Sequence, residues 1–239
     1  MQQLNNQTAL ITGATKGMGR TTAEKLAQAG YNVILAARDA RALASLKHLL
    51  QANHPEISIL YYACDFSDDA QRTSFIQWAT QEHPHIDVLI NNVGIFRPVS
   101  VLDETTEDFN LQLQVNYFTP HLLSRAIGQN MRKNRKGHII NISSIASREP
   151  VSSAGTYTVT KFAVRGLTHV LRDELRPYGV KVTEIIPGST LTSSWEGTTI
   201  PTEQFVQPSD IAEAVLTCLR MSAGANVDEM IVKPKYGNI

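Results

Sequence analysis

The segment spanning residues 8–30 constrains the fold of this chain more than any other stretch. Thr8–Thr12 is a short apolar run that predicts a buried strand, and the turn Gly13-Ala-Thr-Lys-Gly17-Met-Gly19 follows it directly. A helical pattern then runs to Gly30, where the helix is expected to end. Glycines allow a tight turn, and a helix N-terminus offers N–H groups and positive potential, so this segment is suited to hold a pyrophosphate. Because the spacing is Gly-x-x-x-Gly-x-Gly rather than the commoner Gly-x-Gly-x-x-Gly, an ordinary strand-to-helix turn is the alternative.

The rest of the chain alternates predicted strands and helices. The further strands are expected at Asn32–Ala37, Ile57–Ala63, Ile86–Ile90, His138–Ile142, Val180–Ile186 and Glu229–Val232. The helices between them are expected at about 40–52, 68–83, 106–135, 152–178 and 209–221. This alternation predicts an α/β fold: a Rossmann-type, doubly wound parallel sheet of about seven strands with helices on both faces. No Gly/Ser linker divides the 239 residues, so a single domain over residues 1–239 is expected.

Composition excludes several classes of protein. The 22 acidic and 22 basic side chains cancel, so neither a nucleic-acid partner nor a membrane partner is expected. Cys64 and Cys218 lie far apart and the seven histidines are scattered, so neither a disulfide framework nor a metal site is predicted. No apolar run approaches a membrane span, and residues 1–20 lack the pattern of a signal peptide. These features predict a cytoplasmic protein.

Tyr157 and Lys161 are the first candidates for chemistry. They are four residues apart in a predicted helix, so their side chains lie on one face. A free tyrosine has a pKa of about 10 and is a poor acid at neutral pH, but a nearby cation lowers that pKa. The pair therefore predicts a proton donor, Tyr157, and a lysine that tunes it. A half-buried tyrosine beside a surface lysine is the alternative interpretation.

Asn116 and Ser144 are candidates because of their positions. Pro120 lacks an N–H and cannot bond the carbonyl of Asn116, so a helix kink is expected to leave that oxygen free to bind a water. Ser144 follows the strand expected at 138–142, and open α/β sheets bind ligands at the carboxyl ends of their strands. A simple packing kink and an ordinary turn serine are the alternatives.

A polar segment, Ser189–Gln207, follows the sixth predicted strand. Its length and composition suit a mobile lid over a substrate site, at residues 188–207. The residues expected to border the pocket are Ile95, Phe96, Arg148–Val151 and Trp195. The basic run Arg132–Lys136 is expected at a helix C-terminus, where cations complement the helix dipole, and a dock for an acidic carrier protein is the alternative.

These motifs occur in the order typical of the short-chain dehydrogenase/reductase family, which the chain resembles over nearly its whole length. The matching positions, in chain order, are Thr12-Gly13-x-x-x-Gly17-x-Gly19, Asp65, Asn91-Asn92-Val93-Gly94, Asn116, Ser144, Tyr157, Lys161, and Pro187-Gly188 with Thr190 and Thr192. Val93 replaces the family's usual Ala. The ending Val232-Lys-Pro-Lys replaces a frequent Val-Asp-Gly-Gly, which argues against the fatty-acid 3-oxoacyl reductases in particular.

The resemblance implies hydride transfer between a nicotinamide and a carbonyl carbon. Tyr157 would protonate the carbonyl oxygen, and Ser144 would hydrogen-bond that oxygen and stabilise its developing charge. Lys161 would lower the Tyr157 pKa and bind the nicotinamide ribose, while Asn116 would hold a proton-relaying water through its freed carbonyl. The implied cofactor-binding residues are Gly13, Thr15, Lys16, Gly17, Met18, Gly19, Arg38, Asp65, Phe66, Asn92, Val93, Gly94, Tyr157, Lys161, Pro187, Gly188, Thr190 and Thr192.

The end of the second predicted strand favours NADP(H) as the cofactor. An NAD-specific site usually has an acid there, on the ribose 2′-hydroxyl, but this chain has Ala37. Arg38 and Lys16 offer two cations for a 2′-phosphate, and this basic pair resembles the NADP-preferring subgroup of the family. Asp39 would reverse the preference if it lay on the ribose, although its place before a helical run favours a helix cap.

Two classes of function remain open at this point. One is an NADP-dependent reductase that converts a small-molecule carbonyl to an alcohol, and the other is a nucleotide-binding regulatory protein without turnover. The complete set of four catalytic candidates favours the enzyme. Within that class, a 3-oxoacyl-thioester reductase and a reductase of small ketones, pterins or sugars both remain open. The resemblance further implies a homo-oligomer, dimer or tetramer, formed through the helices at about 106–135 and 152–178.

Overall fold

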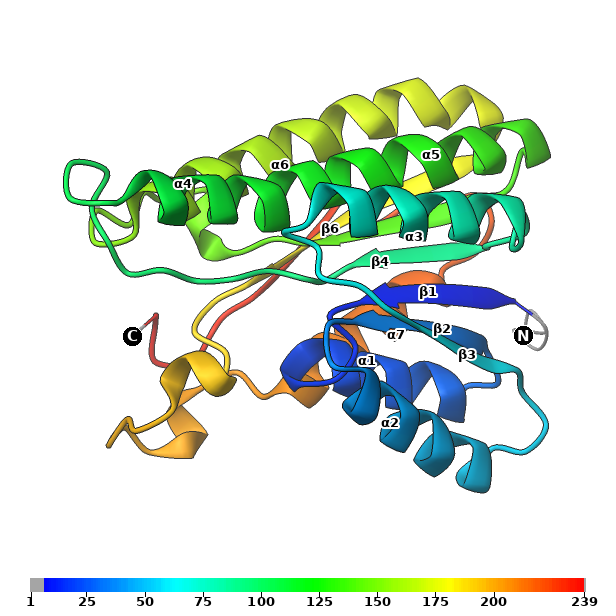
Figure 1. Cartoon of the computed structure of the whole chain (residues 1–239), viewed down its shortest axis with the longest axis horizontal. Helices are drawn as coiled ribbons and strands as arrows, with labels where there is room; N and C mark the ends of the chain where they lie inside the picture. The colour runs from blue at the N-terminus through cyan, green and yellow to red at the C-terminus, as the bar shows by residue number, and fades with distance from the viewer. Residues whose placement is uncertain (1–6, 239) are drawn as a thin grey trace.

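The computed structural model describes residues 7–238, which form one sheet of seven parallel strands in the order β3-β2-β1-β4-β5-β6-β7 (Figure 1). The strands are β1 Thr8–Thr12, β2 Asn32–Ala37, β3 Ile59–Ala63, β4 Val88–Asn91, β5 Gly137–Ile142, β6 Val180–Pro187 and β7 Glu229–Val232. Because all pairings are parallel, the carboxyl ends of the strands lie at the same edge. The predicted fold class is confirmed.

Helices cover both faces of the sheet. Figure 1 shows α1, α2 and α7 on one face and α3, α4, α5 and α6 on the other. Their bounds are α1 Gly17–Gln28, α2 Ala40–Asn53, α3 Asp69–Gln81, α4 Thr106–Leu113, α5 Thr119–Asn134, α6 Gly155–Leu175 and α7 Pro208–Leu219. Most differ from the predicted helices by only one or two residues at each end.

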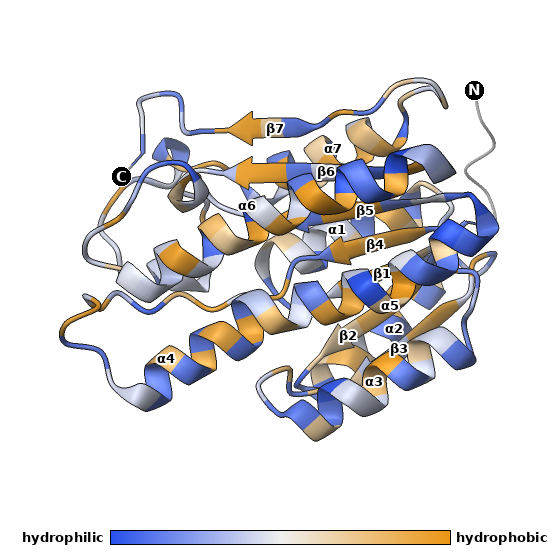
Figure 2. Cartoon of the chain, turned by 90° about the horizontal axis from the view of Figure 1, so that it is seen from above, coloured by the Kyte–Doolittle hydropathy of each residue, from blue (hydrophilic) through white to orange (hydrophobic). Residues whose placement is uncertain are grey.

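Two apolar clusters hold these helices on the sheet. Alternate residues of β1 point to opposite faces, so Ile11 joins the cluster that contains Leu26 of α1, whereas Leu10 joins the cluster that contains Leu123 of α5. Figure 2 shows hydrophilic and hydrophobic residues in turn along α5 and α6, as expected for helices with one buried face. The core therefore consists of two layers that fix the sheet edge where the strands end.

The helix predicted at 106–135 is not a regular α-helix throughout. After α4, a π-helical turn, η1, spans Gln114–Phe118, and α5 begins directly after it. Pro120 accounts for the change, because it cannot donate the hydrogen bond that would continue an α-helix through the carbonyl of Asn116. The chain is therefore helical without a break from Thr106 to Asn134, and the predicted irregularity takes the form of a π-helical turn at the expected place.

The helix predicted at 152–178 is shorter than expected. It is α-helical only over Gly155–Leu175, and a 3-10 turn, η3, follows at Arg176–Tyr178. Pro177 has no N–H to extend the α-helix. At the other end, the N–H of Gly155 donates to the carbonyl of Val99 at 3.0 Å, which ties the start of α6 to the loop before α4.

Two expectations from composition can be compared with the structure. Within residues 7–238, every helix is too short or too polar to cross a bilayer. Cys64 and Cys218 are both free and buried, in agreement with the predicted lack of a disulfide. The predicted domain limits include residues 1–6 and 239, which lie outside the described residues.

Candidate active site

The turn between β1 and α1 has a backbone that favours glycine. Gly13 and Gly17 have φ angles of 68° and 49°, in the left-handed region that disfavours other residues. At Gly19, a Cβ atom would lie 2.3 Å from the Asn92 Nδ2 atom and equally close to the Gly13 carbonyl oxygen. The turn therefore lies directly against the chain that follows β4, and a side chain at Gly19 would push the two segments apart.

The N-terminus of α1 opens onto this turn without a side-chain cap. Lys16 is the N-cap residue, and its side chain makes no capping hydrogen bond. Lys16 is exposed, Thr15 is half-buried, and Met18 packs against the core. Uncapped N–H groups in the first turn, together with the helix dipole, favour an anion at this position. The turn thus fits the pyrophosphate that its sequence predicts.

Thr12 and Asn92 join the glycine turn to the end of β4. The Thr12 hydroxyl oxygen accepts hydrogen bonds from the N–H groups of Asn92 and Val93, both at 3.0 Å. The Asn92 side-chain amide donates to the Thr12 carbonyl oxygen at 2.9 Å. Two motifs far apart in the sequence are therefore held side by side, with the side chain of Val93 against the core.

Arg38 and Asp39 follow β2 and have different surroundings. Arg38 is exposed and comes directly after Ala37, which is buried. The Asp39 Oδ1 atom accepts hydrogen bonds from the N–H groups of Arg41 and Ala42 at 2.9 and 3.0 Å. The predicted helix cap is confirmed, and the Asp39 carboxylate is engaged within its own helix.

Asp65 and Phe66 follow β3. The Asp65 Oδ1 atom accepts hydrogen bonds from the N–H and the hydroxyl of Ser67, at 3.0 and 2.7 Å, which orients the carboxylate. The Phe66 ring is buried and meets Phe75 edge-on, and its carbonyl accepts a hydrogen bond from Arg72 at 2.8 Å. The side chain of Phe66 belongs to the core, so only its backbone remains a candidate for the predicted cofactor contact.

Ser144, Tyr157 and Lys161 come together at the carboxyl end of β5. Ser144 follows this strand closely and hydrogen-bonds the Tyr157 hydroxyl. Lys161 is buried, its Nζ atom lies 5.5 Å from the centre of the Tyr157 ring, and it donates to the Ile142 carbonyl at 3.4 Å. This arrangement excludes the alternative interpretation of a surface lysine.

Asn116 lies in the π-helical turn η1. Its side chain accepts a hydrogen bond from the N–H of Ile95 at 2.8 Å and donates to the Ile95 carbonyl at 3.0 Å. It also donates to the Thr160 hydroxyl at 3.3 Å, and that hydroxyl donates to the Tyr157 carbonyl. Because Pro120 has no N–H, the Asn116 carbonyl lacks its usual α-helical partner. Short π-helical turns of this kind are frequent at functional sites.

Burial has the largest effect on the pKa values of the Tyr157 hydroxyl and the Lys161 ammonium. It raises the pKa of the Tyr157 hydroxyl above its ordinary value, and the Ser144 hydrogen bond lowers it by less. Burial also lowers the pKa of the Lys161 ammonium to about 8, while the charge of Glu184 acts in the opposite direction. In the protein alone, desolvation of the phenolate outweighs the Ser144 hydrogen bond, and the lowering of the Tyr157 pKa by Lys161 stays a prediction.

The segment after β6 bends back over the glycine turn. A Cβ atom at Gly17 would lie 3.3 Å from the Thr192 Cγ2 atom. Thr190 is buried, and its hydroxyl donates to the Gly188 carbonyl at 3.0 Å. The N–H of Gly188 donates to the Val232 carbonyl at 2.8 Å, which ties the start of the segment to β7. The structure therefore brings residues 188–192 beside the glycine turn.

The residues predicted to border a pocket fall into different places. The Phe96 ring meets the Tyr157 ring edge-on, with centroids 5.0 Å apart, so Phe96 lies beside the candidate proton donor. Trp195 packs on Phe205 with centroids 4.9 Å apart, within the predicted lid. Arg148 instead forms an ion pair with Glu229 of β7, so its guanidinium is occupied away from Tyr157.

Sequence reasoning missed a buried polar network beneath the site. The Asn91 amide donates to Ser124 at 2.9 Å and to Asn141 at 2.8 Å, and the Asn141 amide donates to Thr168 at 2.7 Å. The strand was expected to end at Ile90, but β4 extends through Asn91. The sequence did contain a sign of this network, namely the amides Asn91 and Asn141 in neighbouring apolar stretches. Buried amides require hydrogen-bond partners, so polar side chains were to be expected beside them.

Comparisons with known proteins agree with this geometry. A family profile described as short chain dehydrogenase matches residues 7–201. An uncharacterized oxidoreductase from Staphylococcus saprophyticus is 31% identical over 237 residues, covering 98% of this chain and 100% of that protein. Among solved structures, a metagenomic short-chain oxidoreductase in complex with NADP has 30% identity and a TM-score of 0.84, covering 98% of this chain and 99% of the other. An alcohol dehydrogenase from the archaeon Thermococcus sibiricus, complexed with 5-hydroxy-NADP, has 25% identity and a TM-score of 0.89, with coverage of 98% and 99%.

Proposed function

Because this chain belongs to the short chain dehydrogenase family and is an oxidoreductase, we propose that it reduces a carbonyl compound to an alcohol with NADPH as the hydride donor. The observation that carries this proposal is the group formed by Ser144, Tyr157 and the buried Lys161 at the carboxyl end of β5. A protein that only senses a nucleotide has no need of a buried lysine beside a hydrogen-bonded serine–tyrosine pair, since burying a cation is costly.

Each member of the group has a distinct task in the proposed reaction. Ser144 donates a hydrogen bond to the substrate oxygen and stabilises the charge that develops there. Tyr157 supplies the proton to the same oxygen, and the charge on Lys161 stabilises the phenolate that remains. Asn116 holds a water through its backbone carbonyl, so that a proton can return toward Lys161. When bound, the nicotinamide supplies the hydride.

The residues that would hold the cofactor form a continuous line along the edge of the sheet. The pyrophosphate would bind at the N-terminus of α1, and Lys16 and Arg38 would meet a 2′-phosphate. Asp65 would contact the adenine, with Asn92, Val93 and Gly94 beside the adenosine. Pro187, Gly188, Thr190 and Thr192 would hold the nicotinamide carboxamide, and Lys161 its ribose. NADP in the metagenomic relative supports this choice of cofactor.

The substrate site would lie beside Tyr157, next to Phe96 and beneath residues 188–207. The edge-on contact of Phe96 with Tyr157 supports an apolar wall close to the reacting oxygen. Arg148 pairs with Glu229 and is therefore not proposed as a partner for a charged substrate group. The proposed substrates include both 3-oxoacyl thioesters and small ketones, pterins or sugars.

Oxidation of NADPH with a panel of carbonyl compounds tests the proposed function. We expect the absorbance of NADPH to fall with at least one class among 3-oxoacyl thioesters, small ketones, pterins and sugars, at a rate proportional to enzyme concentration. Tight binding of NADPH without oxidation by any member of the panel would instead favour a nucleotide-binding regulatory protein.

Exposed apolar side chains on α4, η1 and α6 support a homo-oligomer. The large apolar residues exposed there are Phe109 on α4, Phe118 in η1, and Val159, Phe162 and Val170 on α6. Val159, Phe162 and Val170 follow helical spacing along one face of α6, where Gly166 leaves open space for a second helix. Contiguous exposed apolar surface of this kind marks contact sites between proteins.

Light scattering at micromolar concentration tests this assembly. We expect a dimer or tetramer, and we expect Phe162→Asp to shift it toward the monomer, because a charge would be buried without a partner in the contact. Leu49→Asp is the matched control, since Leu49 is 42% exposed on α2 and Phe162 is 43% exposed on α6. A monomeric mass for the unaltered protein would overturn the proposal.

A further inference from the structure

Glu184 is a charged residue at the centre of the fold to which the proposed reaction assigns no role. It lies in β6, and its side chain is fully buried. The Oε1 atom accepts a hydrogen bond from the Ser147 hydroxyl at 3.1 Å, whereas the Oε2 atom has no hydrogen-bond partner among residues 7–238. A carboxylate is expensive to bury, so a group that balances its charge is expected nearby.

The fold places Glu184 beneath the start of α6. Its side chain is on the same face of β6 as Val182, which belongs to the cluster under α5 and α6. Glu184 is level with Asn141 of β5, and the next residue of that strand, Ile142, accepts the hydrogen bond from Lys161. Lys161 is therefore the buried cation of the active site that lies over this part of the sheet.

Glu184 is also linked to the turn that carries Ser144. The N–H of Ser147 donates to the Ser144 carbonyl at 2.9 Å, and the Ser147 hydroxyl donates to Glu184. The Ser144 hydroxyl oxygen in turn accepts from the N–H of Ala146 at 3.1 Å. Glu184 therefore contacts the same short turn as the serine that hydrogen-bonds Tyr157.

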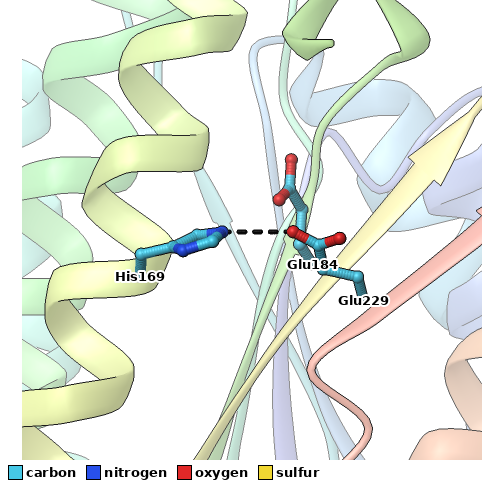
Figure 3. Close-up of side chains that lie close together, drawn as sticks. All are labelled: His169, Glu184 and Glu229. Atoms are coloured by element: carbon cyan, nitrogen blue, oxygen red, sulfur yellow. Dashed lines mark hydrogen bonds and ion pairs between the residues drawn. The ribbon is translucent and has the colours of Figure 1, made fainter.

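Two other ionisable groups close to Glu184 are paired with each other. Figure 3 shows His169 from α6 and Glu229 from β7 beside Glu184, with His169 hydrogen-bonded to Glu229. Ligand atoms of these three residues lie within 4.8 Å of one another, as in a metal site. However, Arg148 and Arg165 both form ion pairs with Glu229, so a metal ion would meet cations instead of free carboxylates. The arrangement is an ion-pair network, and Glu184 is its buried end.

We propose that Glu184 is the buried counter-ion of Lys161, a positioning residue that keeps the lysine protonated and so sets the alkaline limit of the reaction. This inference rests on the proposed function of Lys161. The direction of the electrostatic effect agrees, because burial lowers the pKa of Lys161 to about 8 and Glu184 raises it. Lys161 loses its charge as the pH rises through its pKa, so removal of Glu184 brings that loss to lower pH.

Other charged or titratable side chains surround Lys161 and Glu184, and they come from every element packed against these two residues. They are Tyr157, Arg165, His169 and Arg172 on α6, Arg148 after β5, Asp228 before β7, and Glu229 on β7. Glu229 is neutralised by Arg148 and Arg165, and Asp228 is paired with Arg172. Among residues 7–238, Glu184 makes no direct ion pair and its Oε2 atom has no hydrogen-bond partner, so its charge, which acts on Lys161, is balanced only at longer range.

The direct test is the pKa of Lys161 in Glu184→Gln, a substitution that keeps the shape and removes the charge. Lysine labelled with ¹³C at Cε gives nine signals, and Lys161→Arg identifies the one that belongs to Lys161. We expect the Lys161 pKa to fall by about one unit, the lower end of the effect of one nearby opposite charge. An unchanged Lys161 pKa in this variant would overturn the proposal.

Matched variants separate a charge effect from a packing effect. Glu184→Asp keeps the charge and is expected to restore most of the Lys161 pKa. Glu229→Gln removes a carboxylate of the same network and is expected to leave that pKa unchanged. Should Glu184→Gln fail to fold, Ser147→Ala serves instead, because it removes the hydrogen bond that holds the Glu184 carboxylate in place, and the Lys161 pKa should again fall.

The pH dependence of turnover is the second measurement. If the Lys161 pKa falls by one unit, turnover in Glu184→Gln should drop about fivefold at pH 8 and change little at pH 6. An equal loss at both values would indicate damage to packing and count against the proposal. Because the NMR titration needs no substrate, a fall in the Lys161 pKa without reductase activity would refute the proposed function and leave the assignment of Glu184 intact.

Discussion

Tyr157→Phe is expected to lower turnover by about 10²–10⁴-fold, the usual contribution of general acid catalysis, while NADPH binding stays nearly unchanged. The substitution removes the hydroxyl that hydrogen-bonds Ser144 but keeps the ring that meets Phe96 edge-on and faces the Lys161 ammonium. The ring contacts would therefore persist, and the loss would appear in kcat rather than in affinity for the cofactor. Stopped-flow or steady-state oxidation of NADPH measures kcat, and fluorescence titration measures the affinity for NADPH.

Tyr61 of β3 offers a matched control for this substitution. Tyr61 has the Lys47 ammonium 5.9 Å from its ring centre, much as Tyr157 has Lys161 at 5.5 Å. Tyr61→Phe is expected to leave turnover unchanged, because Tyr61 lies in β3 and faces solvent. Near wild-type reduction by Tyr157→Phe would show that the proton comes from another group and that the proposed mechanism is wrong.

The second large effect concerns the choice of cofactor. We expect kcat/KM to be a hundredfold or more higher with NADPH than with NADH. Arg38 and Lys16 would each make a charge-assisted contact to the 2′-phosphate, and two such contacts at about 1.5–3 kcal/mol each exceed the roughly 2.7 kcal/mol that a hundredfold preference requires. Both side chains are exposed, and Asp39 is engaged as a helix cap, so no carboxylate competes at the end of β2.

The double variant Ala37→Asp with Arg38→Ala tests this assignment. The new carboxylate would accept a hydrogen bond from the ribose 2′-hydroxyl of NADH and repel a 2′-phosphate, so the preference should shrink or invert. Arg41→Ala removes another exposed arginine from the start of α2 and is expected to leave the preference unchanged. Equal efficiency with NADH and NADPH in the unaltered protein would contradict the assignment.

Local patterns were sufficient for the elements of the fold. β1, β2 and β7 begin and end at the predicted residues, because short apolar runs between turn residues leave few alternatives to a buried strand. The Asp39 cap was predictable for a similar reason, since its hydrogen bonds reach only two and three residues along the chain. The order of strands and helices then restricts the topology to a doubly wound parallel sheet.

The location of the candidate site could be predicted, because it follows from this topology. Gly13, Asn92, Ser144 and Gly188 each lie at or just after the carboxyl end of a strand, and parallel pairing gathers these ends along one edge. The spacing of Tyr157 and Lys161 fixes their common helical face. Their common location therefore follows from spacing and the parallel sheet, whereas their catalytic and cofactor-binding roles came from the resemblance to the short-chain dehydrogenase/reductase family.

What the amino-acid sequence determined by itself was thus the fold, the edge of the sheet that holds the site and the residues gathered there. The tertiary structure decided how those residues are charged and paired. It buries both Lys161 and Glu184, raises the pKa of Tyr157 and turns Arg148 toward Glu229. The physical reason is that propensity and spacing act over a few neighbouring residues, whereas desolvation and charge pairing depend on side chains that only packing brings together.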